Sequence, residues 1–449
     1  MKKLDLKVGV SGVRGTIGES LTPRTVIQFT RAFATLAGGG PIAVASDTRP
    51  SGPALIQAVC SGLIFSGVQP LLLGILPTPS TAVYVRKKGL AGGIVITASH
   101  NEDPWNGLKF IDRQGLFLTP FRAQNLLDIY HQQSFLLPGS NDFPEPLFDH
   151  EAFELHSKAI IKQVDLGRIQ KAAFKVFCDP GGGVGGLYSR LFLEQLGCRV
   201  NMLHEKAARF FPRPAEPVPE NLVNTGQAMK SGEYRVGFAQ DPDGDRLMVL
   251  DENGNAVGGE KTLALALDGF LADRNKGRVV VNTATSRLAE WICRSHGCEL
   301  LRAPVGEINV VETMLRSNAI AGGEGNGGII IPAVHACRDS FTGMALILET
   351  LARNPEPVSS LLSRFPDYLR RESRIRVSGS SAYRILNELK KRYPDGDSRD
   401  GLRVEREKYW FLVRISNTEP LIRVTAEGED EGFTDVFNSL LADIKELQK

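Results

Sequence analysis

The most concentrated acidic group in the sequence is 241-DPDGDRL-247. Asp241, Asp243 and Asp245 alternate through a turn that contains Gly and Pro and joins two apolar runs, RVGFAQ and LMVLD. Carboxylates this close repel one another unless a cation neutralises them, and oxygen ligands in a short loop suit Mg²⁺. The segment therefore predicts a magnesium site, with a solvated acidic turn as the alternative.

The stretch 95-VITASHNEDPWNGLKF-110 places Ser99 beside His100, where an apolar strand-like run meets a polar turn that leads to Lys109. A serine hydroxyl attacks only with a nearby base or a charge-neutralising metal. Ser99 is a candidate nucleophile, and a polar connection after a strand is the alternative. The sequence around it supplies neither a hydrolase triad nor an oxyanion hole.

A third segment, 414-RISNTEPLIR-423, combines cations with small polar side chains. Arg414 and Arg423 bracket a turn that carries Ser416, Asn417 and Thr418. Hydroxyls, backbone N–H groups and guanidinium forks are the natural partners of a phosphate dianion. A simple hairpin would more typically carry Asn-Gly or Asp-Gly, so the segment predicts a phosphate site.

The run 322-GGEGNGG-328 has five glycines in seven positions. Glycines let the backbone approach a ligand closely, and Glu324 and Asn326 offer acceptors and a donor to sugar hydroxyls. Taken alone, the run is equally compatible with an ordinary loop.

A second glycine run, 181-GGGVGG-186, follows a strand-like segment and precedes a helical one, with Glu205 about 20 residues on. This is the pattern of a dinucleotide-binding unit, although a tight strand-to-helix turn explains the same glycines. Arg14 in SGVRGTIG and Arg49 in SDTRPS are further cations in turns, placed either to reach a cleft or to stay on the surface.

The six cysteines are scattered and do not form a disulfide framework. One cluster, Cys293-x-x-His296-x-Cys298, invites a zinc interpretation. The segment is predicted to be a helix ending at Gly297, and no second pair of ligands lies nearby. We therefore expect structural cysteines.

These segments need a scaffold, and one strand–helix–strand pattern recurs three times. Its copies are 41–47, 53–67 and 69–75; 174–179, 186–197 and 199–204; and 278–283, 286–297 and 299–304. Continuous apolar strands around a helix that ends in Gly are typical of parallel βαβ units. The prediction is an α/β protein with three related mixed-sheet domains in series.

The C-terminal part departs from this pattern. RIRVSG, a polar helix AYRILNELKKRYP, two strands in EKYWFLVRISNTEPLIRVTAEG and an amphipathic helix FTDVFNSLLADIKELQK predict a small α+β domain. The predicted domains are 1–150, 151–254, 255–368 and 369–449. The Pro-rich segment 210–222 is predicted to be an extended surface loop.

The 449 residues, with 42% hydrophobic and 23% charged side chains, suffice for large cores. A net charge of +2 gives no electrostatic reason to expect nucleic acid or a membrane surface as a partner. No run approaches the ~20 apolar residues of a membrane span, and MKKLDLKVGV lacks the apolar block of a signal peptide. A cytoplasmic location is expected.

Taken in order, four of these segments resemble the α-D-phosphohexomutase superfamily across essentially the whole chain. They are TASHN at 97–101 with NGLK at 106–109, DPDGDR at 241–246, GGEGNGG at 322–328 and RISNTEP at 414–420. The family's architecture of three related α/β domains and a smaller fourth around a central cleft agrees with the predicted pattern. The resemblance implies phosphoryl movement between C1 and C6 of a phosphosugar.

The resemblance also implies a role for each candidate residue. Ser99 would be a phosphoserine that works through a sugar 1,6-bisphosphate, which also serves as activator, and one Mg²⁺ per chain would be held by Ser99 and the three aspartates. The other roles are a reacting centre of Arg14, His100, Lys109 and Arg246, sugar contacts from Glu324 and Asn326, and a passive-phosphate site of Arg414, Ser416, Asn417, Thr418 and Arg423. A small phosphosugar substrate and a monomer or homodimer are expected.

Three positions depart from the commonest family patterns. Glu102 stands where the serine loop often has proline, Gly328 where the sugar loop often has histidine, and Ile308 where a basic residue often follows Val-Gly-acid. His335 is the candidate to replace the missing histidine.

The substrate is a choice between close relatives. GEGNGG and WNGLKF look most like a branch of phosphoglucosamine mutases, with phosphomannomutase or phosphoglucomutase as the runner-up. The rivals from other classes are a nucleotide-dependent oxidoreductase, which GGGVGG would support, and a non-catalytic sugar-phosphate binder, which the missing loop histidine would support.

Overall fold

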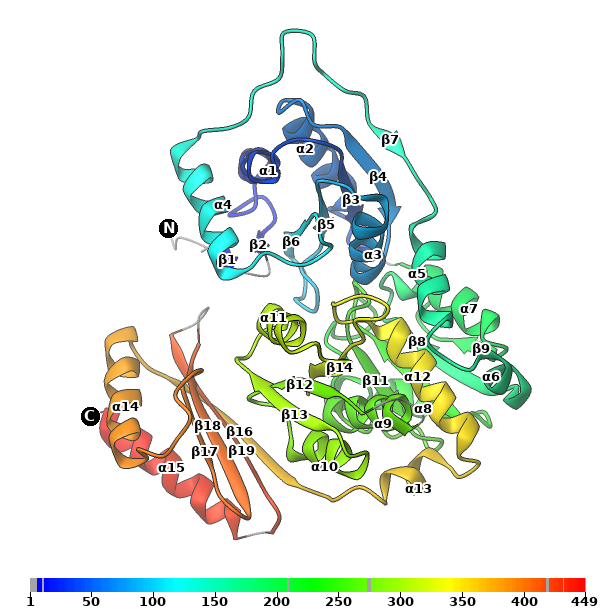
Figure 1. The fold of residues 1–449 in the computed structure, drawn as a ribbon, viewed down its shortest axis with the longest axis vertical. Helices are drawn as coiled ribbons and strands as arrows, with labels where there is room; N and C mark the ends of the chain where they lie inside the picture. The colour runs from blue at the N-terminus through cyan, green and yellow to red at the C-terminus, as the bar shows by residue number, and fades with distance from the viewer. Residues whose placement is uncertain are drawn as a thin grey trace.

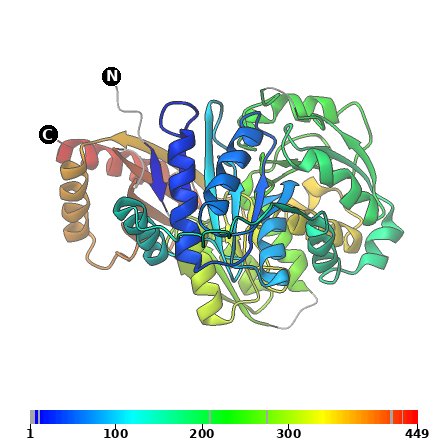
Figure 2. The ribbon, with the colours of Figure 1, turned by 90° about the horizontal axis from the view of Figure 1, so that it is seen from above.

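The computed structural model describes residues 6–9, 12–207, 210–272, 276–416, 420–430 and 432–448. Four sheets follow one another along this part of the chain. In Figure 1 the first sheet lies at the top, the second and third lie below it, and the fourth lies at the lower left. Seen from above, the C-terminal helices and the helices of the second sheet lie at opposite ends of the molecule (Figure 2).

The first sheet has seven strands in the order β1-β2-β6-β5-β3-β4-β7. The strands are β1 Lys7–Gly9, β2 Gly12–Thr16, β3 Ile42–Ser46, β4 Pro70–Ile75, β5 Gly92–Ile96, β6 Trp105–Asp112 and β7 Leu147–Phe148. Along β3, Ile42 and Val44 enter one apolar core, and Ala43 and Ala45 enter another. The strand is therefore buried on both faces, which explains its unbroken apolar run.

Helices cover both faces of this sheet. They are α1 Pro23–Ala37, α2 Gly52–Ile64, α3 Thr78–Lys88 and α4 Pro120–Gln132. Helices α1, α2 and α4 contribute to one core and α3 to the other. Helix α1 begins after Thr22, whose side chain accepts the Thr25 N–H, and ends at a left-handed Gly38. Both caps satisfy backbone groups that the helix itself leaves unpaired.

The second and third sheets have four strands each, in the orders β11-β10-β8-β9 and β13-β12-β14-β15. The strands are β8 Lys175–Asp179, β9 Arg199–Met202, β10 Val236–Gln240, β11 Leu247–Leu250, β12 Arg278–Asn282, β13 Glu299–Ala303, β14 Ala321–Glu324 and β15 Gly328–Ile330. The helices are α5 Ala152–Ile161, α6 Leu166–Ala172, α7 Gly185–Gln195, α8 Val223–Met229, α9 Gly259–Ala272, α10 Arg287–Ser295, α11 Glu307–Ser317, α12 Ser340–Arg353 and α13 Val358–Leu362. The second and third sheets and their helices share one apolar core, which includes the fully buried Phe192, Phe238 and Phe341.

The three predicted strand–helix–strand repeats are confirmed. They form β3-α2-β4, β8-α7-β9 and β12-α10-β13, and the two strands of each repeat pair in parallel. Each of the three sheets also has an antiparallel pair, β5 with β6, β10 with β11, or β14 with β15. The sheets are therefore mixed, as expected.

The fourth sheet is antiparallel throughout, in the order β16-β19-β18-β17. Its strands are β16 Leu369–Arg376, β17 Leu402–Glu405, β18 Tyr409–Ile415 and β19 Leu421–Gly428, and they pack against α14 Gly379–Arg392 and α15 Phe433–Gln448. Strand β17 and helix α13 are not among the predicted elements. Both are short, with four and five residues, and such runs are too brief to show a clear period.

Each of the ranges 1–150, 151–254, 255–368 and 369–449 contains one of the four sheets in full. A domain has its own layers of secondary structure around a core. We propose these ranges as the four domains of the protein.

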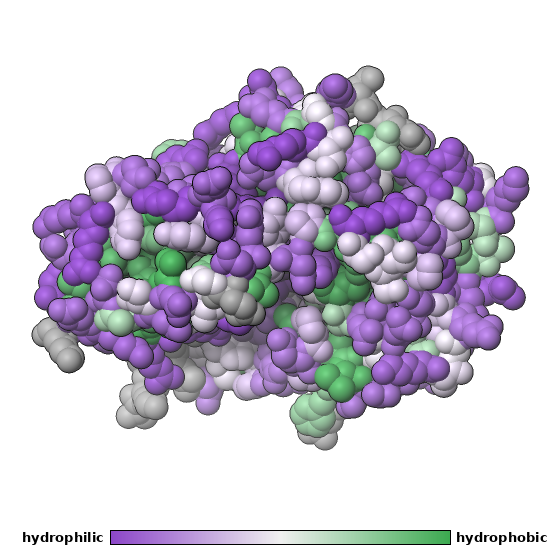
Figure 3. All heavy atoms as spheres, turned by 90° about the horizontal axis from the view of Figure 1, so that it is seen from below, coloured by the Kyte–Doolittle hydropathy of each residue, from purple (hydrophilic) through white to green (hydrophobic). Residues whose placement is uncertain are grey.

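The surface is mostly polar on the face seen in Figure 3. Hydrophilic side chains cover most of that face, and apolar side chains form separate patches. Among the described residues, no helix has the length and apolarity that a membrane crossing requires.

Candidate active site

Two loops from different sheets meet at the centre of the candidate site. The serine loop, 97–101, follows β5, and the aspartate loop, 241–245, joins β10 to β11. Thr78, the first residue of α3, donates its backbone N–H to the Asp243 carbonyl at 3.0 Å. These contacts bring the Ser99 hydroxyl to 3.3 Å from Asp241 Oδ2, although 142 positions separate the two residues.

The serine loop holds Ser99 in a conformation that L residues rarely adopt. Ser99 has φ 52°, in the left-handed region, and it is buried. Its N–H donates to Thr97 Oγ1 at 2.9 Å, and Arg49 donates to its carbonyl at 2.9 Å. Arg49 also pairs with Asp47 and donates to the Asn101 carbonyl. Such strain persists only where the surroundings over-determine it, and it is typical of functional positions.

The three aspartates of the aspartate loop form a compact acidic cluster. Asp241, Asp243 and Asp245 are buried, and one oxygen of each lies within 4.8 Å of the others. Among the described residues, Oδ1 of Asp243 and Oδ1 of Asp245 have no hydrogen-bond partner. Buried carboxylates are paired, protonated or bound to a metal, and these two oxygens are available to a cation. The donor set, all oxygen and in one short loop, fits Mg²⁺.

Two buried cations balance the outer side of this cluster. Lys109 Nζ lies 2.6 Å from Asp243 Oδ2 and 2.9 Å from Asp245 Oδ2, and Arg338 donates to Asp245 Oδ2 at 2.8 Å. Burial alone would lower the pKa of Lys109, but the carboxylates of Asp243 and Asp245 outweigh it and raise that pKa. Lys109 is therefore held as an ammonium beside the serine loop.

The electrostatics of the cluster differ from one carboxylate to the next. Burial raises the pKa of Asp241 well above its ordinary value, and the charges of Asp245 and Asp243 raise it further. Burial alone would also raise the pKa of Asp245, but the cations around it, led by Arg338 and Lys109, hold that pKa well below its ordinary value. Positive charge is therefore concentrated around Asp245, while Asp241, which lies next to Ser99, is the carboxylate with the least compensation.

The glycine run 322–328 is connected to the aspartate loop by Arg338, a residue that the sequence analysis did not single out. Glu324, the last residue of β14, accepts from Asn282 Nδ2 at 2.8 Å and from Arg338 NH1 at 3.1 Å. Because Arg338 also binds Asp245, one guanidinium links this run to the aspartate loop. In the sequence, Arg338 is recognisable only as a cation just before an apolar helix, and many surface residues share that feature.

Arg338 also explains the departure at Gly328. A Cβ built on Gly328 would lie 2.3 Å from Arg338 Cδ, so a larger residue has no room there. His335 lies elsewhere: it is buried, and its Nε2 lies 2.8 Å from the Gly115 carbonyl. Burial lowers the pKa of His335 to about 4, so this ring is neutral near neutral pH.

Glu102, the departure in the serine loop, is exposed and accepts the Trp105 N–H at 3.0 Å through its carbonyl. Its side chain has no role that the structure explains.

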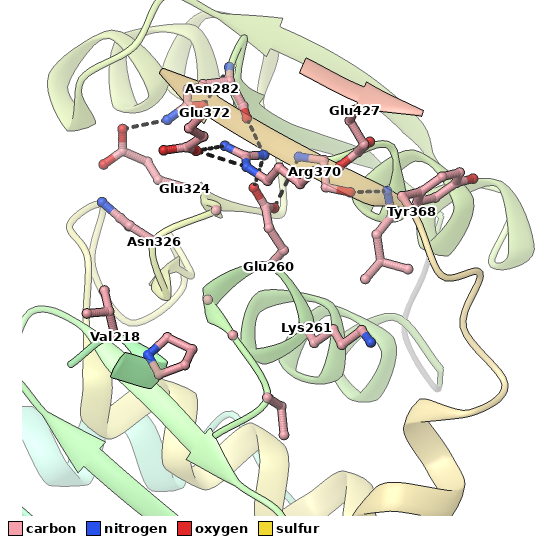
Figure 4. Close-up of a pocket in the computed structure, with 18 of the residues that line it drawn as sticks. Val218, Glu260, Lys261, Asn282, Glu324, Asn326, Tyr368, Arg370, Glu372 and Glu427 are labelled. Carbon is pink, nitrogen blue, oxygen red and sulfur yellow. Dashed lines mark hydrogen bonds and ion pairs between the residues drawn. The ribbon is translucent and has the colours of Figure 1, made fainter. Parts of the chain in front are cut away.

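A cleft of about 550 Å³ opens beside Glu324 and Asn326. In Figure 4, Asn282 points at Glu324, while Glu260 and Glu372 point at Arg370. The lining is acidic: it includes Glu220, Glu260, Glu324, Glu372 and Glu427, against Lys261 and Arg370.

A smaller cavity of about 170 Å³ shares part of this lining and continues the cleft along the fourth sheet. Arg414 and Arg423 line it from directly opposed positions on β18 and β19. Arg414 Nε donates to Asp400 Oδ1 at 2.8 Å. The Ser416 N–H donates to the Leu421 carbonyl at 2.9 Å and closes the turn, while Asn417 and Thr418 lie outside the described residues.

Two further predicted residues contact the serine loop or belong to it. Arg14 donates to Asn101 Oδ1 at 2.9 Å, and His100 Nδ1 lies 3.4 Å from Ser99 Oγ. Burial, and after it the charges of Arg246 and Arg14, lower the pKa of His100 to about 2. The imidazole is therefore neutral, with one nitrogen able to accept a proton.

Arg246 donates to Glu216 Oε1 at 2.7 Å. Glu216 belongs to the Pro-rich segment and was not among the predicted site residues. It looks like an ordinary loop acid in the sequence.

Two other motifs have structural explanations. In the run 181–186, a Cβ on Gly186 would lie 1.9 Å from the Glu205 carbonyl oxygen, and a Cβ on Gly183 would lie 2.5 Å from Pro242 Cα. These glycines serve close packing between protein segments. In the cysteine cluster, Cys293 is buried and His296 Nε2 lies 2.7 Å from Asp268 Oδ1.

Comparison with known proteins matches the same segments. Family models for phosphoglucomutase/phosphomannomutase match in order: alpha/beta/alpha domain I at residues 5–136, domain II at 154–254, domain III at 258–368 and the C-terminal domain at 372–438.

Relatives match over nearly the full length. A protein of Methanopyrus kandleri named "Probable phosphoglucosamine mutase" is 32% identical over 98% of this chain and 99% of its own. The "Phosphoglucomutase/phosphomannomutase" of Thermococcus kodakarensis is 33% identical over 94% of each chain. A crystal structure of a phosphoglucomutase/phosphomannomutase family protein from Burkholderia thailandensis superposes with a TM-score of 0.84, at 26% identity over 98% of each chain.

The folds and the order of the four segments agree with these matches. The chain therefore belongs to the phosphoglucomutase/phosphomannomutase family within the α-D-phosphohexomutase superfamily, and it is a phosphohexomutase, an isomerase that acts by intramolecular phosphoryl transfer.

Proposed function

We propose that the chain interconverts the 6-phosphate and the 1-phosphate of glucosamine through a phosphoserine at Ser99. The observation that carries this proposal is the Ser99 hydroxyl, 3.3 Å from the cluster of three buried aspartates. The geometry suits a hydroxyl that must accept and release a dianionic group beside a divalent cation.

Residues of both loops would hold the metal. Asp241, Asp243 and Asp245 would supply carboxylate oxygens, and phosphorylated Ser99 would supply a phosphoryl oxygen. One bound Mg²⁺ per chain neutralises charge on the transferring phosphoryl group. Lys109 pairs with Oδ2 of Asp243 and of Asp245, which would leave Oδ1 of each available to the ion.

The transfer itself exchanges one P–O bond for another. The phosphoryl group leaves Ser99 Oγ, which takes up a proton, and bonds to the free hydroxyl of the sugar, whose proton is released to a base of the site. After the 1,6-bisphosphate reorients, its other phosphate returns to Ser99 Oγ and the sugar oxygen takes up a proton. When Ser99 is phosphorylated again, its hydroxyl proton passes to a base of the site, and His100 Nδ1, 3.4 Å from Oγ, orients that hydroxyl as a hydrogen-bond acceptor. Arg14 and Arg246 offset negative charge at the reacting centre.

The cleft supports the rest of the assignment. Glu324 and Asn326 read the sugar hydroxyls, and Arg414, Ser416, Asn417, Thr418 and Arg423 hold the phosphate that is not being transferred. The two cavities share lining residues, which supports one ligand reaching from Glu324 to Arg414. A fixed phosphate site on a separate sheet lets the bisphosphate turn without leaving.

The acidic lining of the cleft favours an aminosugar as substrate. Glu260 and Glu372 pair with Arg370, and Glu324 pairs with Arg338. Lys261 is then the other lining cation against the two remaining glutamates, Glu220 and Glu427. An ammonium group at C2 would reduce this excess negative charge. The name of the Methanopyrus kandleri relative points to the same substrate, while that of the Thermococcus kodakarensis relative keeps mannose and glucose phosphates as the alternative.

The test of the phosphoserine is a comparison of two serines that both face a histidine. Ser99→Ala should lower turnover at least about 1,000-fold and abolish the fraction of molecules that is heavier by one phosphoryl group. Ser80, whose Oγ lies 2.9 Å from His156 Nδ1 in a fully buried pair, is the control, and Ser80→Ala should keep both. Undiminished turnover in Ser99→Ala would refute the proposal.

The test of the substrate is kcat/KM for the phosphates of glucosamine, mannose and glucose, measured with Mg²⁺ and a bisphosphate activator. Glucosamine phosphate should rank first. A higher kcat/KM for mannose or glucose phosphate would assign the runner-up activity instead.

The proposal further places the enzyme in the cytoplasm, as a monomer or homodimer.

A further inference from the structure

The Pro-rich segment 210–222 is fixed at several points along its length. Arg213 donates to Asp179 Oδ2 at 3.0 Å and to the Gln240 carbonyl at 2.7 Å. The ring of Phe211 lies 4.9 Å from the guanidinium of Arg49, the residue that binds the Ser99 carbonyl. Because each proline also fixes its own φ, the segment has little freedom to move away from the serine loop.

One side chain of this segment is directed at the reacting centre. Glu216 Oε1 accepts from Arg246 NH1 at 2.7 Å and lies 4.0 Å from His100 Nε2. Asn221 Nδ2 holds the Glu216 carbonyl at 2.9 Å, which anchors the backbone on which this carboxylate stands. The opposite edge of the His100 ring faces Ser99 Oγ at 3.4 Å. Ser99, His100 and Glu216 therefore lie in a row.

A neutral imidazole carries one N–H, and its neighbours decide which nitrogen bears it. A carboxylate beside Nε2 favours the proton on Nε2, because N–H and carboxylate attract while a lone pair and a carboxylate repel. Nδ1 is then left as an acceptor for the Ser99 hydroxyl. The 4.0 Å separation is longer than a hydrogen bond, so the effect is electrostatic orientation.

We propose that Glu216 is a positioning residue of the phosphoryl-transfer centre: it keeps the proton of His100 on Nε2 and holds Arg246 beside the serine loop. This inference rests on the function proposed above. Glu216 acts through His100 and Arg246 and does not touch the reacting atoms. Without its carboxylate, Arg246 would turn toward Asp245 Oδ1, which already lies 3.9 Å from Arg246 Nε.

The kinetic test uses Glu216→Gln, with Glu216→Asp as the conservative variant. Glu205→Gln is the matched control, because Glu205 pairs with Arg190 at 2.8 Å, is similarly exposed and does not contact the serine loop. We expect Glu216→Gln to lower kcat about 10- to 100-fold with KM changed less than about twofold. Glu216→Asp should recover part of the loss, and Glu205→Gln should match the wild type.

The second readout is the tautomer of His100 from its ring ¹⁵N chemical shifts near neutral pH, assigned by the signals that His100→Gln removes. The wild type should show Nε2–H, and Glu216→Gln should shift the ring toward Nδ1–H. A kcat of Glu216→Gln within about twofold of wild type, a loss confined to KM, or an unchanged tautomer would each overturn the inference. The tautomer measurement does not depend on turnover, so it tests the role of Glu216 alone. The Ser99→Ala variant tests the proposed mutase function, and the two proposals can therefore fail independently.

Discussion

Two neighbouring strands of the second sheet lead to aspartates with opposite surroundings. Strands β8 and β10 are parallel, and Asp179 ends β8 opposite Ala239, two residues before Asp241. Both aspartates are fully buried. The carboxylate of Asp179 accepts four hydrogen bonds, from Gly181 N–H at 2.8 Å, His204 Nδ1 at 3.1 Å, Arg213 Nε at 3.0 Å and Thr225 Oγ1 at 2.6 Å.

The donors decide what each buried carboxylate can do. Burial alone would raise the pKa of Asp179, but its partners, led by His204 and Arg213, outweigh it and lower that pKa to about 2. Burial instead raises the pKa of Asp241, and its acidic neighbours add to the rise. Asp179 therefore holds protein segments together, while the aspartate loop is left short of positive charge and is suited to a metal. Burial of an aspartate is not in itself a sign of a metal site.

The largest expected effect separates the two regions by activity. Asp243→Asn removes one metal ligand of the proposed set, and we expect turnover to fall at least about 1,000-fold because charge neutralisation at the phosphoryl group is lost. The melting temperature of the metal-free variant should change little, because the removed repulsion between carboxylates offsets the lost pair with Lys109, which Asp245 still holds at 2.9 Å. Differential scanning fluorimetry with and without Mg²⁺ checks this: Mg²⁺ should raise Tm in the wild type only. A full Mg²⁺ response in the variant would show that the metal is held elsewhere.

At Asp179 we expect the opposite result: a loss of stability with the Mg²⁺ response retained. Asp179→Asn leaves Arg213 buried beside a neutral group, and we expect a loss of about 3 kcal/mol in the free energy of unfolding. The Mg²⁺ response of Tm should persist, because the aspartate loop is intact. Urea unfolding of both proteins measures the loss, and stability equal to the wild type would remove the structural role from Asp179.

The sequence predicted the parts of the site that are written in short runs. The three aspartates, Ser99 with His100, and the glycine run each lie within a few residues, and their chemistry is visible in the letters. The scaffold was predictable for a similar reason: strands buried on both faces are continuous apolar runs, and parallel pairs need a helix between them. The length of β17 was insufficient for such a pattern.

The residues that connect these runs could not be predicted. Arg338 binds Asp245 from 93 positions away, and Glu216 meets Arg246 from a Pro-rich loop. Either residue, read alone, is an ordinary charged surface residue. Asp179 is the opposite case. An aspartate after a strand and before a glycine run suggests a ligand site in the sequence, and only its four donors in the structure reveal a structural role.

A smaller effect follows from the pH dependence of the Asp179 network. Its pKa is lowered from 3.8 to about 2 in the folded protein, so the carboxylate favours folding above the ordinary pKa. This contribution, about 2 kcal/mol, should be lost as the pH falls from about 4 toward about 2. The stability difference between wild type and Asp179→Asn should therefore narrow with acidification, as urea titrations at a series of pH values would show. A difference independent of pH would mean that packing, and not charge, accounts for the loss.

The smallest effect compares two threonines that make the same hydrogen bond in the two regions. Thr225 donates to Asp179 Oδ2 at 2.6 Å and Thr78 donates to Asp243 Oδ2 at 2.6 Å, and both are buried. Each valine variant should cost about 1.5 kcal/mol, the value of one hydrogen bond to a charged group. Only Thr78→Val should also weaken the Mg²⁺ response and turnover, because Asp243 loses a donor that orients its carboxylate toward the cluster. Equal turnover in the two variants would mean that Lys109 alone is sufficient to orient Asp243.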